Sequence, residues 1–375
     1  MTGSARPGRT RGGLRGGAPV ALVGLAGALA VPAARAQGPV LYAPNQASAS
    51  VSVIDARTRR VLETVDLQAL GFAADSRPHH TVVEPDGSYW YVSLIGARKV
   101  LKFDRANRLA GQADVEAAGM LALDPSSDRL LVAPSMTAVN PPSRIGVVDR
   151  RTMRTLEPLE VLVARPHALA LHPRGRYAYV GSVATNQLAV VDLETERVAP
   201  VTVDGPPNTF VQFAVAPDGS RLVVTGQLSG DLLVFDLADP GAPRYLTRVH
   251  VGAGPYHPAY APDGRAVYVA VQRDNAVAIV DARDWRVRST IRDSALAQPH
   301  GLAPSRDGRW LFVSNENVGG PAPAGAHAEH GGMRHDAPAA SPAGRVAVID
   351  LAAGRVVAAV DTGRQTAGLS LSPTP

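Results

Sequence analysis

The sequence contains no cysteine. Disulfides, thiolate metal ligands, cysteine nucleophiles, covalently attached c-type haem and a lipid-modified N-terminal cysteine are therefore excluded. Any bound metal ion must be held by nitrogen, oxygen or thioether ligands. Beyond the first 36 residues, no stretch approaches the roughly 20 continuous apolar residues that a membrane-spanning helix needs, so we expect no transmembrane anchor in the mature chain.

The first 36 residues have the pattern of a secretory signal peptide. An apolar run from about residue 18 to 31 follows a basic segment and ends at the small-residue site Ala34-Arg35-Ala36. We expect segment 1–36 to be removed and the mature protein, residues 37–375, to be periplasmic or secreted. An uncleaved N-terminal anchor is the alternative, because Arg35 is unusual so close to a cleavage site.

An excess of positive charge is also missing from the mature chain. The full sequence has 38 Lys and Arg residues against 33 Asp and Glu residues. Five of the arginines lie within segment 1–36, and without them the two signs balance; they are Arg6, Arg9, Arg11, Arg15 and Arg35. A neutral chain lacks the broad positive field that dominates affinity for nucleic acids, so we expect no nucleic-acid partner.

What the chain does contain is a repeat. Each copy reads as an apolar strand, a Pro-Asp-Gly-like turn, a Tyr-Val-like strand, a strand ending in aspartate, and a valine-rich strand. The aspartates that end the third strands are Asp55, Asp104, Asp149, Asp192, Asp236, Asp281 and Asp350. They are 43 to 49 residues apart except for a last interval of 69, and four-stranded propeller blades have a period of about 40 to 50 residues. The pattern predicts an all-β, seven-bladed β-propeller.

The two ends of the repeat array are complementary. The first copy lacks its opening strand and starts directly at 40–42, whereas the C-terminus supplies a surplus strand at 367–373. We expect this C-terminal strand to complete the first blade and close the ring, which removes unpaired strand edges. Because a closed ring has no edge that demands a partner, we expect a monomer.

The repeat copy Pro166–Ser182 and the segment Val51–Asp55 carry a family resemblance. They resemble the YVTN propellers, including the YncE-like periplasmic proteins, and the likeness covers nearly the whole mature chain. It implies the propeller fold but no single activity, because propellers host lyases, lactonases, dehydrogenases and pure binding proteins.

Histidines occupy the start of several inner strands, which line the central channel of a propeller. We expect five of them to converge at the channel mouth from blades 2, 4, 6 and 7: His79, His80, His167, His257 and His300. Imidazoles without cysteine favour copper or zinc, and a set of histidines alone suits copper. The alternative is that these histidines are structural and form hydrogen bonds across the channel. Neighbouring residues on a strand point opposite ways, so His79 and His80 both reach one ion only if the strand is distorted.

The His79–His80 doublet resembles the propeller domain of nitrous oxide reductase, which gathers a copper cluster from channel histidines, and also copper-dependent methanethiol oxidase and the selenium-binding propellers. This chain has no cupredoxin domain, and it has five ring histidines where the cluster of the reductase uses seven. The resemblance therefore implies at most a mononuclear or binuclear copper site.

The long last interval comes from an insert at 318–343 in blade 7, rich in Gly, Pro and Ala. It contains a second candidate set of soft metal ligands: His327, His330, Met333 and His335. The insert joins the second and third strands, so we expect it to emerge on the face where the ring histidines open, as a lid or metal donor. The alternative is a solvated loop whose histidines have no role.

Three functions remain open. The leading hypothesis is an exported propeller that binds a small ligand or a copper ion at the channel mouth through the five ring histidines. The second is a copper-dependent oxidoreductase that uses the same ring, with the insert as its lid. The third is a protein-interaction scaffold, with a partner on one propeller face and structural histidines.

Overall fold

A computed structural model describes residue 3, residues 38–318 and residues 342–373. The described residues from 38 onward belong to one compact unit. The expected signal peptide, apart from Gly3, and most of the blade 7 insert lie outside the described residues. Within the described part, no helix is long and apolar enough to span a membrane.

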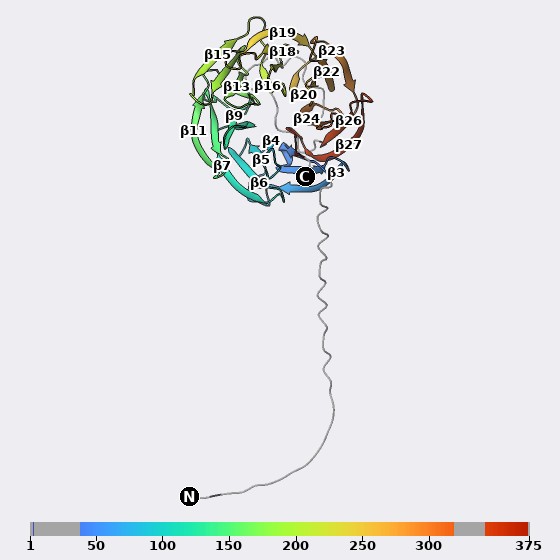
Figure 1. The fold of residues 1–375 in the computed structure, drawn as a ribbon. Helices are drawn as coiled ribbons and strands as arrows, with labels where there is room; N and C mark the ends of the chain where they lie inside the picture. The colour runs from blue at the N-terminus through green and yellow to red at the C-terminus, as the bar shows by residue number, and fades with distance from the viewer. Residues whose placement is uncertain (1–2, 4–37, 319–341, 374–375) are drawn as a thin grey trace. The chain divides into compact units, whose positions relative to one another are not determined.

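Seven four-stranded antiparallel sheets form a ring, which confirms the predicted seven-bladed β-propeller (Figure 1). Blade 1 has the sheet order β28-β1-β2-β3, and blades 2 to 7 are the six following groups of four consecutive strands, β4–β7 to β24–β27. One 3-10 helix, η1 (Gln46–Ser48), follows β1.

The strands have the following bounds. The inner strands are β28 (Ser370–Leu371), β4 (Pro78–Val83), β8 (Ala118–Leu123), β12 (Pro166–Leu171), β16 (Phe210–Val215), β20 (Pro255–Tyr260) and β24 (Pro299–Pro304). The second strands are β1 (Val40–Asn45), β5 (Tyr89–Leu94), β9 (Arg129–Pro134), β13 (Tyr177–Ser182), β17 (Arg221–Gly226), β21 (Ala266–Val271) and β25 (Trp310–Asn315). The third strands are β2 (Ser50–Asp55), β6 (Lys99–Asp104), β10 (Arg144–Asp149), β14 (Gln187–Asp192), β18 (Asp231–Asp236), β22 (Ala276–Asp281) and β26 (Ala343–Asp350). The outer strands are β3 (Arg60–Asp66), β7 (Leu109–Asp114), β11 (Arg154–Glu160), β15 (Val198–Thr202), β19 (Arg244–His250), β23 (Val287–Arg292) and β27 (Arg355–Arg364).

Each third strand ends at its predicted aspartate because that side chain shapes the next turn. In blade 3 the Asp149 carboxylate accepts hydrogen bonds from the backbone N–H groups of Arg151 and Thr152, at 2.9 and 2.8 Å. These hydrogen bonds lower the pKa of the Asp149 carboxyl. An aspartate at this position therefore ends the strand and starts the hairpin to the outer strand.

The C-terminal strand closes the ring as predicted. Strand β28 pairs with β1, so that Leu371 lies opposite Leu41 and Ser370 opposite Tyr42. The Val40 N–H donates to the Ser372 hydroxyl at 2.8 Å. Blade 1 is thus built from both ends of the propeller, and its second strand has a hydrogen-bonded neighbour on each side.

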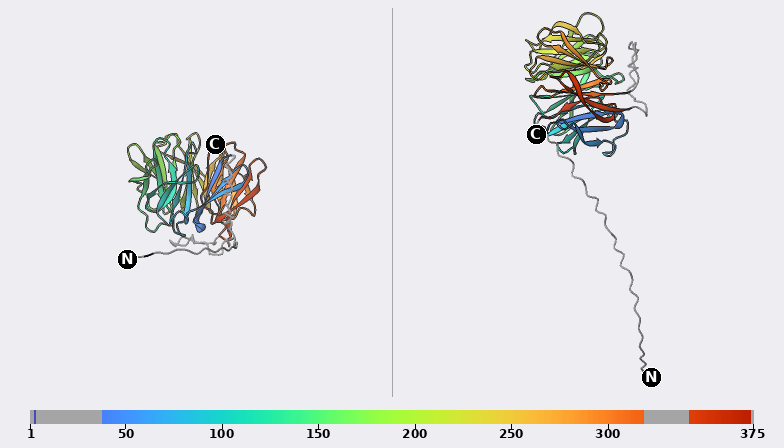
Figure 2. Two further views of the ribbon diagram at one scale, coloured as in Figure 1. Left: turned by 90° about the horizontal axis from the view of Figure 1, so that it is seen from below. Right: turned by 90° about the vertical axis from the view of Figure 1, so that its right-hand side faces the viewer.

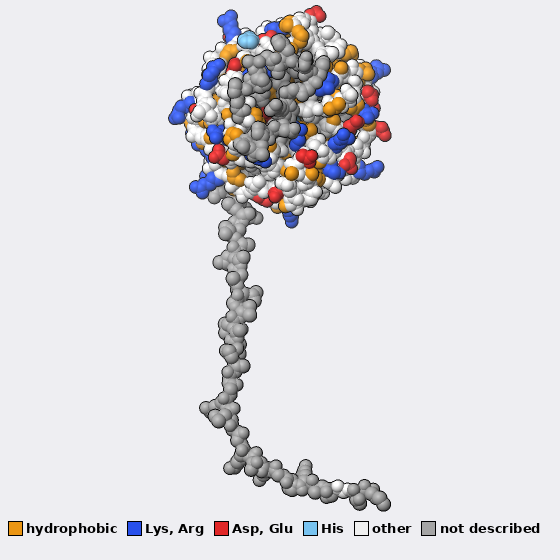
Figure 3. All heavy atoms as spheres, turned by 180° about the vertical axis from the view of Figure 1, so that it is seen from behind, with side chains coloured by type: hydrophobic (Ala, Val, Ile, Leu, Met, Phe, Trp, Pro, Cys, Tyr) orange, Lys and Arg blue, Asp and Glu red, His pale blue; other side chains and the backbone are white. Residues whose placement is uncertain are grey.

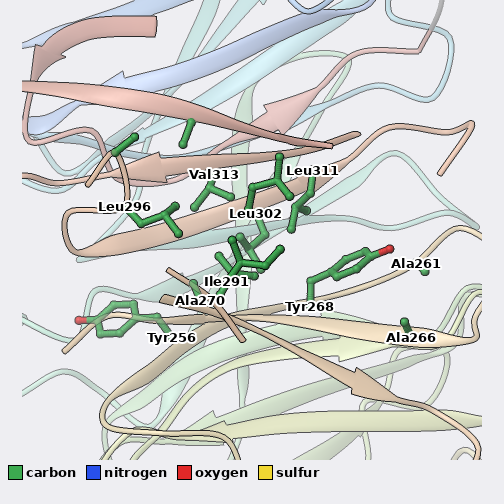
Figure 4. Close-up of a cluster of buried hydrophobic side chains, with 14 of the residues drawn as sticks. Tyr256, Ala261, Ala266, Tyr268, Ala270, Ile291, Leu296, Leu302, Leu311 and Val313 are labelled. Atoms are coloured by element: carbon green, nitrogen blue, oxygen red, sulfur yellow. The ribbon is translucent and has the colours of Figure 1, made fainter. Parts of the chain in front are cut away.

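The hydrophobic core lies between neighbouring blades. Figure 4 shows the cluster at the junction of blades 6 and 7, where Tyr268 and Ile291 from blade 6 pack with Leu302, Leu311 and Val313 from blade 7. Inner and middle strands are almost entirely buried, whereas the outer strands are largely exposed. Each blade therefore buries its apolar faces only against its neighbours in the ring.

The strands run between the two faces of the ring (Figure 2). The turn face carries the hairpins from inner to second strand and from third to outer strand. The mouth face carries the loops from second to third strand and those that enter each inner strand. Figure 3 shows Lys and Arg side chains interspersed with Asp and Glu around the rim.

Candidate functional site

The inner strands are distorted where they begin at the mouth face. In blades 2 to 7 the pairing of the inner strand with the second strand shifts register within its first residues. The residue before each of these strands has a positive φ; these residues are Arg77, Ala117, Arg165, Thr209, Gly254 and Gln298. A bulge of this kind leaves a residue unpaired and re-aims its side chain. Blade 2 has its shift between Pro78 and Thr81, so the distortion that the His79–His80 doublet needs is present.

Hydroxyl groups hold these bulges and join neighbouring blades. The Ser93 hydroxyl accepts a hydrogen bond from the His80 N–H at 3.1 Å and donates one to the Gly119 carbonyl of blade 3 at 2.6 Å. The Thr225 hydroxyl likewise accepts a hydrogen bond from the Gln212 N–H of its own blade at 3.2 Å and donates one to the Tyr256 carbonyl of the next blade at 2.5 Å. The backbone that carries the channel residues is therefore fixed from both sides.

Four of the five predicted histidines are in direct ring contact. The ring centroids of His257 and His300 are 5.0 Å apart, those of His79 and His300 5.4 Å, and those of His80 and His257 5.8 Å. They come from blades 2, 6 and 7 and so meet across the channel. Residues from the two ends of the repeat array thus form one imidazole cluster, as the sequence predicted.

His167, the fifth predicted histidine, is fixed by a separate contact. Its Nδ1 donates to the Pro134 carbonyl at 2.9 Å. In a neutral imidazole this hydrogen bond leaves the lone pair on Nε2. His167 acts electrostatically on His80, His257 and His300, so it belongs to the same environment.

Burial keeps four of these rings neutral, those of His80, His167, His257 and His300. The five side chains are between 2% and 9% exposed. Burial, reinforced by the neighbouring imidazoles, lowers the pKa of His80 and of His257 to about 3. Burial lowers the pKa of His167 to about 4, against the opposing effect of the Pro134 carbonyl, and that of His300 well below its ordinary value. Near neutral pH these four rings are uncharged and each carries one lone pair.

The hydrogen bonds decide which nitrogens offer that lone pair. His80 Nδ1 accepts from the Leu121 N–H at 3.3 Å, which places its proton on Nε2. His300 Nδ1 is buried with no hydrogen-bond partner among the described residues. His300 and His167 therefore have a nitrogen ready to bind an ion, whereas the His80 ring must rotate to offer one.

A second layer of polar groups surrounds His300. Glu316 Oε1 lies 3.8 Å from His300 Nε2, and Glu316 Oε2 accepts from Gln272 at 3.4 Å. Burial raises the pKa of Glu316 to about 7, against the opposing charge of Arg77. The Tyr256 ring lies 4.8 Å from that of His300, and its hydroxyl donates to the Met136 thioether at 3.6 Å.

Met136 is a residue that sequence reasoning missed. It lies in the loop after β9, outside the repeat motif, and its position beside Tyr256 depends on the packing of blades 3 and 6 across the channel. No signal in the sequence marks it, because a lone methionine in a polar loop has no period or spacing to distinguish it.

The nitrogen atoms of the cluster do not converge on one point. Within residues 38–318 and 342–373, no group of three or more His, Asp or Glu side chains is arranged to hold a metal ion. Metal binding by the ring thus stays a prediction. The second predicted set, His327, His330, Met333 and His335, lies outside the described residues.

Comparison with protein-family models gives no match. The chain is 25% identical over 205 residues to YncE of Salmonella typhi and to YncE of Salmonella typhimurium. These alignments cover 51% of this chain and 54% of either relative, so the chain spans about half the length of the curated relatives it matches. The predicted likeness to YncE is present as weak homology. The likeness to nitrous oxide reductase, methanethiol oxidase and selenium-binding propellers stays a prediction.

Solved structures share the fold. A periplasmic gluconolactonase of Pseudomonas aeruginosa has a TM-score of 0.69 at 20% identity, covering 90% of this chain and 100% of the other. A functionally unknown protein from Desulfotomaculum acetoxidans has a TM-score of 0.70 at 12% identity, covering 90% and 99%. Hydrazine synthase of Kuenenia stuttgartiensis has a TM-score of 0.60 at 19% identity, covering 78% of this chain and 88% of the other. At these identities the likeness shows the propeller fold alone.

Proposed function

We propose that this protein is an exported propeller that binds one copper ion in its channel, through imidazoles of His79, His80, His167, His257 and His300. The observation that carries the proposal is the buried cluster of contacting, uncharged imidazoles contributed by separate blades. Export rests on the signal-like pattern of residues 1–36.

The donor chemistry fits copper. An uncharged set of imidazoles suits copper and zinc, and a set of histidines alone suits copper. A buried nitrogen without a hydrogen-bond partner is costly, by about 1 to 3 kcal/mol, and His300 Nδ1 is such an atom among the described residues. A bound cation satisfies it.

The ring spacing also fits. With metal–nitrogen bonds of about 2 Å, the centroids of two imidazoles bound to one ion lie about 5 to 6 Å apart. The three measured separations, 5.0, 5.4 and 5.8 Å, fall in that range. Because the imidazole nitrogens do not face one point in this structure, binding requires the rings to rotate about their side-chain bonds, most of all that of His80.

Elemental analysis of the untagged mature protein, after copper loading and washing, tests the proposal. We expect about one copper per chain in the wild type, and its loss in the double variant His257→Ala/His300→Ala. The matched control is His250→Ala, because His250 lies on the outer strand β19 beside Asp231 and its side chain is 73% exposed. A variant lacking 320–341 separates the channel from the insert.

Two results would overturn the proposal. One is the absence of stoichiometric copper from the wild type even after loading. The other is copper that survives the double substitution and disappears with the insert, which would assign the metal to the insert.

A further inference from the structure

A cavity of about 270 Å³ opens between blades 5 and 6, on the turn face, away from the channel mouth. Its walls come from three hairpin turns: the turn after β16, the turn after β20 and the turn after β22. The side chains that shape it include Tyr260 and Trp285, with the rings of Pro217 and Pro262.

The repeat explains why the cavity exists. At three of the junctions between blades, two positions face each other: the residue after the inner strand, and the residue after the third-strand aspartate of the next blade. Between blades 2 and 3 they are Glu84 and Arg150, whose side chains form an ion pair at 2.7 Å. Between blades 6 and 7 they are Ala261 and Leu351, which pack in one hydrophobic cluster.

At the junction of blades 5 and 6 both positions are alanine. Ala216 and Ala282 each line the cavity. One junction earlier, the position of Ala216 is held by His172, whose Nε2 donates to the Gly219 carbonyl of the next blade at 3.2 Å. The imidazole that fills that junction is thus missing here, and a space large enough for a ring is left.

The lining of the cavity selects its occupant. Tyr260 is 8% exposed, and its hydroxyl is buried with no hydrogen-bond partner among the described residues. Trp285 packs against the same hydrophobic cluster. The charged groups are the carboxylates of Asp218 and Asp263 and the guanidinium of Arg221.

The Arg221 Nη1 donates to the Asp236 carboxylate at 2.8 Å, which Arg244 also contacts at 2.9 Å, and Asp263 forms an exposed pair with Arg265 at 4.0 Å. In the lining itself the carboxylates of Asp218 and Asp263 outnumber the single guanidinium of Arg221, so the rim has a small negative balance. Such a rim repels anions and attracts cations, and the aromatic walls favour a flat ring.

We propose that this cavity binds a small monocyclic aromatic molecule that is neutral or cationic. An apolar cavity of about 150 Å³ holds benzene, so this one accommodates a single ring with a short polar substituent. The ring lies between Trp285 and Tyr260, and the substituent reaches the Tyr260 hydroxyl or the carboxylates at the rim.

Tryptophan fluorescence tests the proposal with three probes of one size: benzylamine, phenol and benzoate. The chain has three tryptophans. Trp90 is fully buried. In a Trp310→Phe background the signal change therefore reports on Trp285. We expect saturable binding of benzylamine and phenol, and at least about fivefold weaker binding of benzoate because of the negative rim.

Two variants fill the cavity with residues that other blades use. Ala216→His introduces the residue of blade 4, and Ala282→Leu introduces the residue that blade 7 has in Leu351. Both variants are expected to abolish binding of the probes. If one of them fails to fold, the other still tests whether the cavity is the binding site. Ala352→His, in the exposed turn of blade 7, is the control and keeps wild-type affinity. Absence of saturable binding, tighter binding of benzoate than benzylamine, or unchanged affinity in a folded filling variant would refute the proposal.

Discussion

Acidification from pH 7.5 to pH 5 is expected to lower the free energy of unfolding by several kcal/mol through the channel histidines. In the unfolded chain a histidine has a pKa of about 6.5. In the folded protein the pKa is about 3 for His80 and His257 and about 4 for His167. Between pH 6.5 and about 4 the unfolded chain therefore binds protons that the folded protein does not, so stability falls as the pH falls.

The magnitude follows from the same values. At pH 5 each buried neutral histidine reduces the free energy of unfolding by about 2 kcal/mol relative to pH 7.5, and three together by about 6 kcal/mol. The slope approaches about 4 kcal/mol per pH unit near pH 5, since each proton contributes about 1.4 kcal/mol per unit. Glu316 opposes this effect, because burial raises its pKa to about 7 and the folded protein therefore binds its proton within this range before the unfolded chain does; it offsets about 2 kcal/mol and leaves a net loss of about 4 kcal/mol. Staying at or above pH 5 keeps the titration of the other carboxylates small.

Guanidinium unfolding curves at several pH values between 7.5 and 5 measure this slope. His257→Gln removes one titrating group and is expected to reduce the slope by about 1.4 kcal/mol per pH unit. His250→Gln, at a largely exposed side chain, is the control for the substitution itself. A free energy of unfolding that stays flat between pH 7 and 5 would refute the conclusion that the channel histidines are buried and uncharged.

Two further predictions concern the ring that carries the site. Deletion of 366–375 removes β28 and reopens blade 1, so the melting temperature of the whole propeller should fall; an unchanged melting temperature contradicts the closure. Ser93→Ala removes the hydroxyl that joins the His80 N–H to the Gly119 carbonyl and should reduce the free energy of unfolding by about 1 to 3 kcal/mol, whereas Ser93→Thr should retain most of it. Denaturant curves at pH 7.5 distinguish these outcomes, and equal stability of the alanine and threonine variants would show that the bridge contributes nothing.

The propeller architecture could be predicted because short-range interactions that repeat along the sequence determine where its strands end. Asp149 and its counterparts end each third strand through short-range hydrogen bonds to the next turn, and such a device recurs at a fixed spacing. Closure by 367–373 follows from counting strands. The positions of His79, His167 and His300 follow from the same repeat, since equivalent residues of a propeller face the same channel.

The finer features depend on contacts between blades. The Leu121 N–H of the next blade donates a hydrogen bond to His80 Nδ1, and this contact fixes the tautomer of the His80 ring. The proximity of Met136 to Tyr256 comes from blades on different sides of the channel. The cavity arises from two alanines that are 66 positions apart in the chain, and neither is unusual by itself. The sequence therefore predicts the propeller and the positions of its channel histidines, whereas the tautomers, the neighbours of the site and the cavity depend on how the blades pack.

The decisive measurement for copper binding is diffraction from copper-loaded crystals of residues 37–375, recorded on both sides of the copper absorption edge. We expect one anomalous peak in the channel, with ring nitrogens of at least three of the histidines at about 2 Å; the candidates are His79, His80, His167, His257 and His300. A channel without a copper peak, with copper absent or bound only elsewhere, would contradict it.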